Sequence, residues 1–71
     1  MNSIIAGGDF VAELVAARKK KGLSQAELAV RAGLPQSTIG RIEARLVSPN
    51  LETLNKILPV LGLRLHLFGD D

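Results

Sequence analysis

The stretch Ser24–Glu43, SQAELAVRAGLPQSTIGRIE, decides how the rest of this 71-residue chain is organised. Ser24 followed by Glu27 at the third position after it is a capping box, which marks the start of a helix. Gly33 and Pro35 then mark a tight turn, after which a second short helix begins. One side of this second helix carries small or polar residues, which are Gln36, Ser37, Gly40 and Arg41. Such a side is suited to lying against a surface whose chemistry it reads.

Further helices are predicted on both sides of this stretch. The apolar spacing before it predicts a helix from Asp9 or Phe10 to Lys21. The segment after it predicts a helix that begins behind the N-cap Asn50 and ends or bends at Pro59. The side chains expected to form the core are Phe10, Leu14, Ala17, Leu28, Ala29, Ala32, Ile39, Ile42, Leu51, Leu54, Ile57, Leu58 and Leu61.

The last part of the chain changes its hydrophobic period. From position 63 onward leucines alternate with other residues, and this period of two predicts one half-buried strand. A lone strand leaves backbone donors and acceptors unpaired, so we expect it to pair antiparallel with the same strand of a second copy. The alternative is a frayed tail that happens to alternate. The expected dimer interface comprises Leu63, Arg64, Leu65, His66, Leu67 and Phe68.

These elements predict an all-α fold, a bundle of four to five short helices, with one C-terminal β-strand that pairs across a dimer. We divide the chain into a flexible N-terminal arm (1–8), a helix-turn-helix domain (9–62), the dimerising strand (63–68) and an acidic tail (69–71). A chain of this length without a disulfide or metal often completes its core by association, which also favours a homodimer.

The composition excludes several classes of protein. The chain has no cysteine and one histidine, His66, so we expect neither a disulfide nor a metal site. We find no nucleophile–base pair and no phosphate-binding loop, so we expect neither an enzyme nor a cofactor. No apolar run approaches the length of a membrane span. We therefore expect a cytoplasmic protein without membrane contact.

Basic residues gather in the middle of the chain. Between Arg18 and Arg45 there are seven basic residues and two acidic ones, although the net charge of the chain is only +2. A basic middle segment favours a polyanionic partner. The alternative interpretation is a solvated basic surface without a partner.

With these features the chain resembles the Cro/C1-type (XRE) family of helix-turn-helix proteins, which includes the lambdoid phage repressors. The resemblance rests chiefly on Ser24, Gln25, Glu27, Leu28, Ala29, Gly33, Ile39, Ile42 and Glu43. The tail LGLRLHLF (61–68) is similar to the dimerising strand of the HipB antitoxins, which pair with a HipA-type kinase toxin. The resemblance implies a lambda-repressor-like bundle.

The same resemblance implies a function. It is sequence-specific binding of double-stranded operator DNA by a homodimer that represses transcription. On the HipB likeness, the protein is an antitoxin that represses its own operon and binds a HipA-like kinase toxin. The alternatives are a regulator without a toxin partner, or chiefly a protein-interaction module.

The resemblance also implies roles for individual residues. Glutamine bonds well to adenine and arginine to guanine, and the base-reading residues are Gln36, Ser37, Gly40 and Arg41. The phosphate-binding residues are Gln25, Thr38, Arg45, Ser48, Asn50 and Lys21. For Gln25 this agrees with the attraction of a helix N-terminus for anions, and the alternative is an ordinary first-turn residue. Arg18 and Glu43 are expected to form a partly buried ion pair that fixes the angle of the reading helix.

Two positions depart from the family's pattern. Gly40 stands where many relatives have serine, and it weakens a helix by about 1 kcal/mol relative to alanine. Arg45 stands where the family usually has the glycine that ends the reading helix. Because the left-handed backbone conformation is costly for arginine, we expect the helix to run on or to end differently there.

Overall fold

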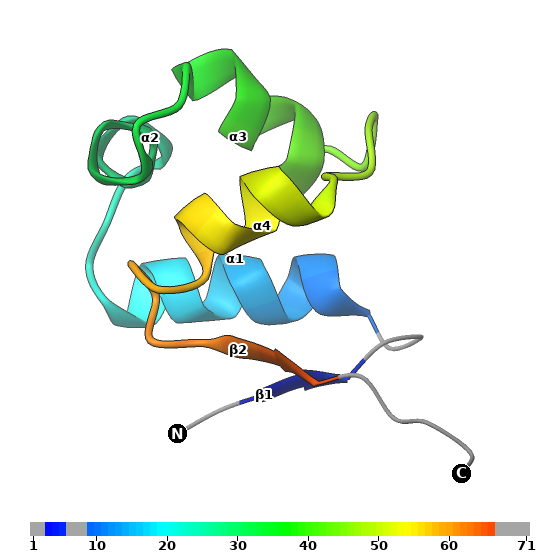
Figure 1. Ribbon diagram of the computed structural model, residues 1–71. Coiled ribbons are helices and arrows are strands. Elements are labelled where there is room, and N and C mark those ends of the chain that lie inside the picture. The colour runs from blue at the N-terminus through cyan, green and yellow to red at the C-terminus, as the bar shows by residue number, and fades with distance from the viewer. Residues whose placement is uncertain (1–2, 6–8, 67–71) are drawn as a thin grey trace, which may run out of the picture.

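Four helices and two short strands make up the part of the chain that the computed structural model describes, which is residues 3–5 and 9–66 (Figure 1). In chain order the elements are β1 (Ser3–Ile5), α1 (Phe10–Lys20), α2 (Gln25–Ala32), α3 (Gln36–Glu43), α4 (Leu51–Ile57) and β2 (Arg64–His66). The predicted all-α bundle is therefore confirmed. Figure 1 shows α3 at one end of the molecule and the two strands at the other, with α1 and α4 between them.

The helices begin where the sequence places their caps. The Ser24 hydroxyl accepts a hydrogen bond from the Glu27 backbone N–H at 3.0 Å, and the Glu27 carboxylate accepts one from the Ser24 N–H at 2.9 Å. The Asn50 side chain accepts from the Thr53 N–H at 2.8 Å at the start of α4. Each bond satisfies a backbone donor that has no partner within the helix. The predicted capping box and the N-cap of α4 are confirmed.

The end of α3 departs from the prediction. Arg45 adopts the left-handed conformation, with φ +64°. Its N–H donates to the Ile42 carbonyl at 3.0 Å, and the Leu46 N–H donates to the Arg41 carbonyl at 2.9 Å. This pair of bonds is a Schellman motif, and it forms here without the usual glycine. The expectation that α3 runs on or ends differently is therefore wrong, because the two bonds hold Arg45 in a conformation that costs about 1–2 kcal/mol.

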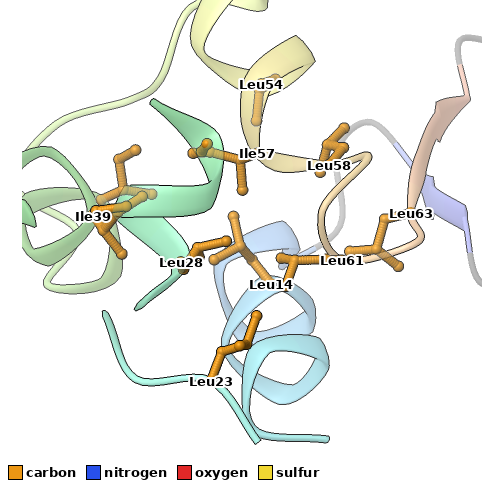
Figure 2. Packing of buried hydrophobic residues seen from close by; sticks show 12 residues of the cluster. Leu14, Leu23, Leu28, Ile39, Leu54, Ile57, Leu58, Leu61 and Leu63 are labelled. Atoms are coloured by element: carbon orange, nitrogen blue, oxygen red, sulfur yellow. The ribbon is translucent and has the colours of Figure 1, made fainter. Parts of the chain in front are cut away.

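The core brings apolar side chains from all four helices into one cluster (Figure 2). Its fully buried members are Leu14, Leu28, Ile39, Ile42 and Ile57. Burial decreases along α4 from its end towards its first residue: Ile57 is fully buried, Leu54 is 9% exposed and Leu51 is 61% exposed. The first turn of α4 thus projects past the core, and the prediction that Leu51 is buried is wrong.

The C-terminal strand finds a partner within its own chain. Strand β2 pairs with β1 in parallel, in the register Ser3↔Arg64, Ile4↔Leu65 and Ile5↔His66. The prediction of a lone strand is therefore wrong, because Ser3–Ile5 supplies its partner. Segments from the two ends of the chain lie side by side (Figure 1), so the backbone groups of each supply partners for the other. The rest of the arm, Leu67, Phe68 and the acidic tail lie outside the described residues.

Candidate nucleic-acid interface

Helix α3 presents one polar side to the outside. Ile39 and Ile42 are 0% and 1% exposed and fix the rotation of the helix on the core. On the opposite side Gln36, Ser37 and Arg41 are exposed. The structure thus brings the three predicted base-reading side chains together on the outer surface of one helix. Gly40 and Thr38 lie on the same helix and are half-buried.

An ion pair joins α3 to α1. The Arg18 Nε donates to Glu43 Oε2 at 2.7 Å, and Arg18 Nη2 donates to Glu43 Oε1 at 2.9 Å. The two side chains are only 11% and 7% exposed. Arg18 Nη1 also donates to the Leu23 carbonyl at 2.8 Å, so the guanidinium is held at three points. The predicted contact between Arg18 and Glu43 is present, in a two-pronged geometry that sets direction as well as distance.

Gln25, at the first position of α2, completes a network with this pair. Its amide nitrogen donates to Glu43 Oε1 at 2.9 Å, so the carboxylate connects α1, α2 and α3. The sequence predicted that this side chain binds a DNA phosphate. In the structure it instead donates to an acceptor within the protein. The amide nitrogen carries a second N–H. The first backbone N–H groups of a helix have no partner within that helix, and at α2 the one of Glu27 is already capped by Ser24. The contact with Glu43 therefore leaves donors for a phosphate.

The network keeps Glu43 charged. Burial by itself raises the pKa of the Glu43 carboxyl, but the hydrogen bonds from Arg18 and Gln25 outweigh burial and bring the pKa below its ordinary value. The hydrogen bond to Glu43 likewise raises the pKa of the Arg18 guanidinium. The paired arginine neutralises the charge that this carboxylate places at the end of α3.

The predicted phosphate-binding residues outside α2 and α3 have varied positions. Arg45 forms an ion pair with Asp9 at 2.9 Å, and the Asn50 side chain is engaged as the N-cap of α4. Ser48 is exposed in the loop between them. The Lys21 ammonium lies 3.7 Å from where a Cβ at Gly62 would stand, beside the turn that leads to β2.

The residues of the predicted dimer interface also differ in how exposed they are. Leu63 is only 8% exposed and belongs to the core of its own chain. Leu65 is half-buried against that core, and Arg64 is exposed. His66 is the last described residue of β2. Among the described residues, the predicted interface could therefore use the backbone of β2, but few apolar side chains that are not already packed on the core of their own chain.

Two further predictions concern metals and membranes. No group of His, Cys, Asp and Glu that could hold a metal ion occurs among residues 3–5 and 9–66. Within the same residues no helix is long and apolar enough to cross a membrane.

Gly40 is not required by the packing of this fold. A Cβ built at Gly40 would meet only Gln25 Oε1, at 3.6 Å, which is ordinary van der Waals contact. We expect Gly40→Ala to raise the free energy of unfolding by about 0.5–1 kcal/mol, because glycine loses more backbone entropy in a helix. Urea denaturation followed by circular dichroism measures this. A destabilised variant would show that the backbone of α3 cannot keep its place over Gln25.

These features define a helix-turn-helix protein whose second helix is held by the core and by a partly buried ion pair. The chain belongs to the Cro/C1-type family of such proteins, because that family's sequence profile, described as Helix-turn-helix, matches residues 14–68.

Named relatives agree with this assignment. An uncharacterised HTH-type transcriptional regulator of Haemophilus influenzae is 40% identical over 58 residues, which are 82% of this chain and 59% of that protein. The regulator PuuR of Escherichia coli is 44% identical over 76% of this chain and 29% of its own length. SinR of Bacillus subtilis is 38% identical over 76% of this chain and 50% of its own length. The chain thus spans only part of the length of these relatives, which are all described as HTH-type transcriptional regulators.

Proposed function

We propose that this protein is a transcriptional regulator that binds operator DNA with α3 in the major groove. The observation that supports it most is the division of α3 into a buried side, with Ile39 and Ile42, and an exposed side, with Gln36, Ser37 and Arg41. Arg41 bonds both acceptors of a guanine edge, and Gln36 bonds adenine in the same two-pronged way. The N-terminus of α2, with Gln25, faces a phosphate and fixes the register. The protein acts in the cytoplasm.

The regulator binds a palindromic site as a homodimer. The two α3 helices then enter successive major grooves, roughly 34 Å apart. Two strands with three residues each form a sheet far below the size that is stable alone. Antiparallel pairing of β2 with β2 of a second copy enlarges that sheet and covers the second edge of the strand.

The dimer is tested with a chain that ends at Leu63. This variant keeps the buried Leu63 side chain and loses β2. We expect sedimentation equilibrium to give a monomer mass for it and a dimer mass for the full chain. A dimer mass for both would reject pairing through β2.

DNA binding is tested by its dependence on salt. Operator sequences are first selected from a random duplex library, and the affinity for the best of them is measured over a range of NaCl concentrations. Neutralised phosphates release counterions, so the logarithm of the binding constant should fall with the logarithm of salt by about 0.9 for each phosphate contact. An affinity independent of salt would contradict the proposal.

The biological setting has two candidates. The relatives, including PuuR and SinR, are described as transcriptional regulators, which favours a regulator without a toxin partner. The alternating tail with strand β2 favours a HipB-like antitoxin, whose partner would be a HipA-like kinase toxin. A kinase encoded by the neighbouring gene, bound and inhibited by the purified protein, would decide for the antitoxin.

A further inference from the structure

The residue that ends α3 has an unusual backbone. Arg45 is the only residue other than glycine with a positive φ among the described residues, at +64°, whereas Gly22, Gly33 and Gly62 have values of 69° to 71°. Residues with a side chain rarely adopt this conformation. Such an outlier is a reason to look for a role of the side chain. For Arg45 we look for this role in the contacts of the guanidinium, which is the polar group of the side chain.

The guanidinium is bound by the residue that starts α1. Arg45 Nη2 lies 2.9 Å from Asp9 Oδ1 and 3.0 Å from Asp9 Oδ2, across 36 positions of sequence. Asp9 has a second task, because its Oδ1 accepts the Ala12 N–H at 3.2 Å and caps α1. The hydrogen bond from Arg45 is the main reason why the pKa of Asp9 lies below its ordinary value, so Asp9 is charged at neutral pH.

The ion pair is exposed and therefore exchangeable. The two side chains are 57% and 56% exposed, in contrast to the nearly buried pair of Arg18 and Glu43. Exposed pairs of this kind contribute little to stability and compete with water and other ions. A DNA phosphate offers arginine the same two-oxygen geometry as a carboxylate. Arg45 lies in the turn directly after the C-cap of α3. A duplex that is read by α3 therefore passes near this end of the helix.

We propose that Asp9 is an intramolecular competitor of DNA for Arg45: it holds the guanidinium in the free protein and yields it to a backbone phosphate in the complex. The inference rests on the proposed binding of DNA by α3. Asp9 thereby lowers the affinity for all sequences alike, because a phosphate contact carries no base information. A purely structural tie between α1 and α3 would affect unfolding and leave DNA affinity unchanged.

The test uses Asp9→Asn. Asparagine caps a helix as well as aspartate does, so α1 keeps its start, but the charge that holds Arg45 is gone. We expect the variant to bind a fluorescent mixed-sequence duplex about twofold to fivefold more tightly at low salt, which corresponds to the loss of one exposed ion pair. Fluorescence anisotropy measures this without knowledge of the operator.

Two further variants separate the competitor from a simple change of charge. Glu13→Gln removes one negative charge from the same first turn of α1, where Glu13 forms no ion pair within the described part of the chain. It should have less effect than Asp9→Asn. Arg45→Gly removes the guanidinium and suits the left-handed backbone. It should weaken binding and lower the salt slope by about 0.9, and Asp9→Asn should add nothing to it.

The outcomes are distinct. Equal gains from Asp9→Asn and Glu13→Gln, or a gain that persists beside Arg45→Gly, would overturn the competitor and leave only long-range repulsion. An unchanged affinity of Asp9→Asn would overturn it as well, while the proposed function stands. If the unaltered protein binds no DNA, the proposed function fails first and the inference falls with it.

Discussion

Glu43→Gln is expected to lower the free energy of unfolding by about 3 kcal/mol, because it leaves the nearly buried Arg18 guanidinium without a counter-charge. A chain of 71 residues has in total roughly 4–10 kcal/mol of stability. One atom exchanged in the carboxylate therefore removes a large part of it. The chain has neither Trp nor Tyr, so urea denaturation is followed by far-ultraviolet circular dichroism.

A double variant separates the charge from the shape of the contact. Arg18→Met combined with Glu43→Leu leaves no charge in the interface, and such replacements of a buried pair are often neutral or stabilising. We expect the double variant to be more stable than Glu43→Gln alone. It should nevertheless discriminate operator sequences less well, because the two-pronged contact that orients α3 is lost. A cost below about 0.5 kcal/mol for Glu43→Gln, which is the size expected for a surface substitution, would contradict the role of the pair.

Lowering the pH should reduce the free energy of unfolding through the Glu43 carboxylate. The folded-state pKa of Glu43 lies below its ordinary value, since the bonds from Arg18 and Gln25 exceed the opposing effect of burial. The unfolded chain thus takes up the proton first, and the contribution of the carboxylate is fully present above the ordinary pKa of glutamate. It is lost as the pH falls through the lower pKa of the folded state. Glu43→Gln should therefore lose less stability than the unaltered protein over this acid range.

Much of the fold follows from local sequence. The caps of α2 and α4 and the turn at Gly33 depend on side chains within three or four positions of the backbone groups they satisfy. The buried sides of α2 and α3 follow from helical spacing in the same way. Leu51 fits the apolar stripe of α4 equally well, yet spacing says nothing about where the core ends along a helix.

The contacts that the sequence did not reveal are long-range. Gln25 and Glu43 are 18 positions apart, and Asp9 and Arg45 are 36 positions apart. No periodic pattern links such residues, and Gln25 and Asp9 already have adequate local roles as a first-turn residue and a capping residue. The three-residue strand β1 is too short for a pattern, and only its place beside β2 makes it a strand. At Arg45 the cost of a left-handed arginine was known, but not the hydrogen bonds that outweigh it.

The largest effect on DNA recognition is expected for Arg41→Ala and Gln36→Ala. Each removes a two-pronged contact worth about 1–3 kcal/mol of discrimination between bases, which is roughly a fivefold to 150-fold loss of preference at one base pair. Affinity for the selected operator and for single-base variants of it, measured at one salt concentration, gives this preference directly. Both side chains are exposed, so the free energy of unfolding should change by less than about 0.5 kcal/mol.

Arg31→Ala is the matched control for Arg41→Ala. Arg31 is also exposed, but it belongs to the last turn of α2 and not to α3. Loss of its charge should weaken all sequences alike, because a charge outside the reading helix acts through the general attraction to phosphates. If Arg41→Ala behaved in the same way, Arg41 would contact a phosphate and base reading would fall to Gln36 and Ser37. If neither Arg41→Ala nor Gln36→Ala altered DNA binding, base reading by these two side chains would be rejected, and the exposed side of α3 would be open to a protein partner instead.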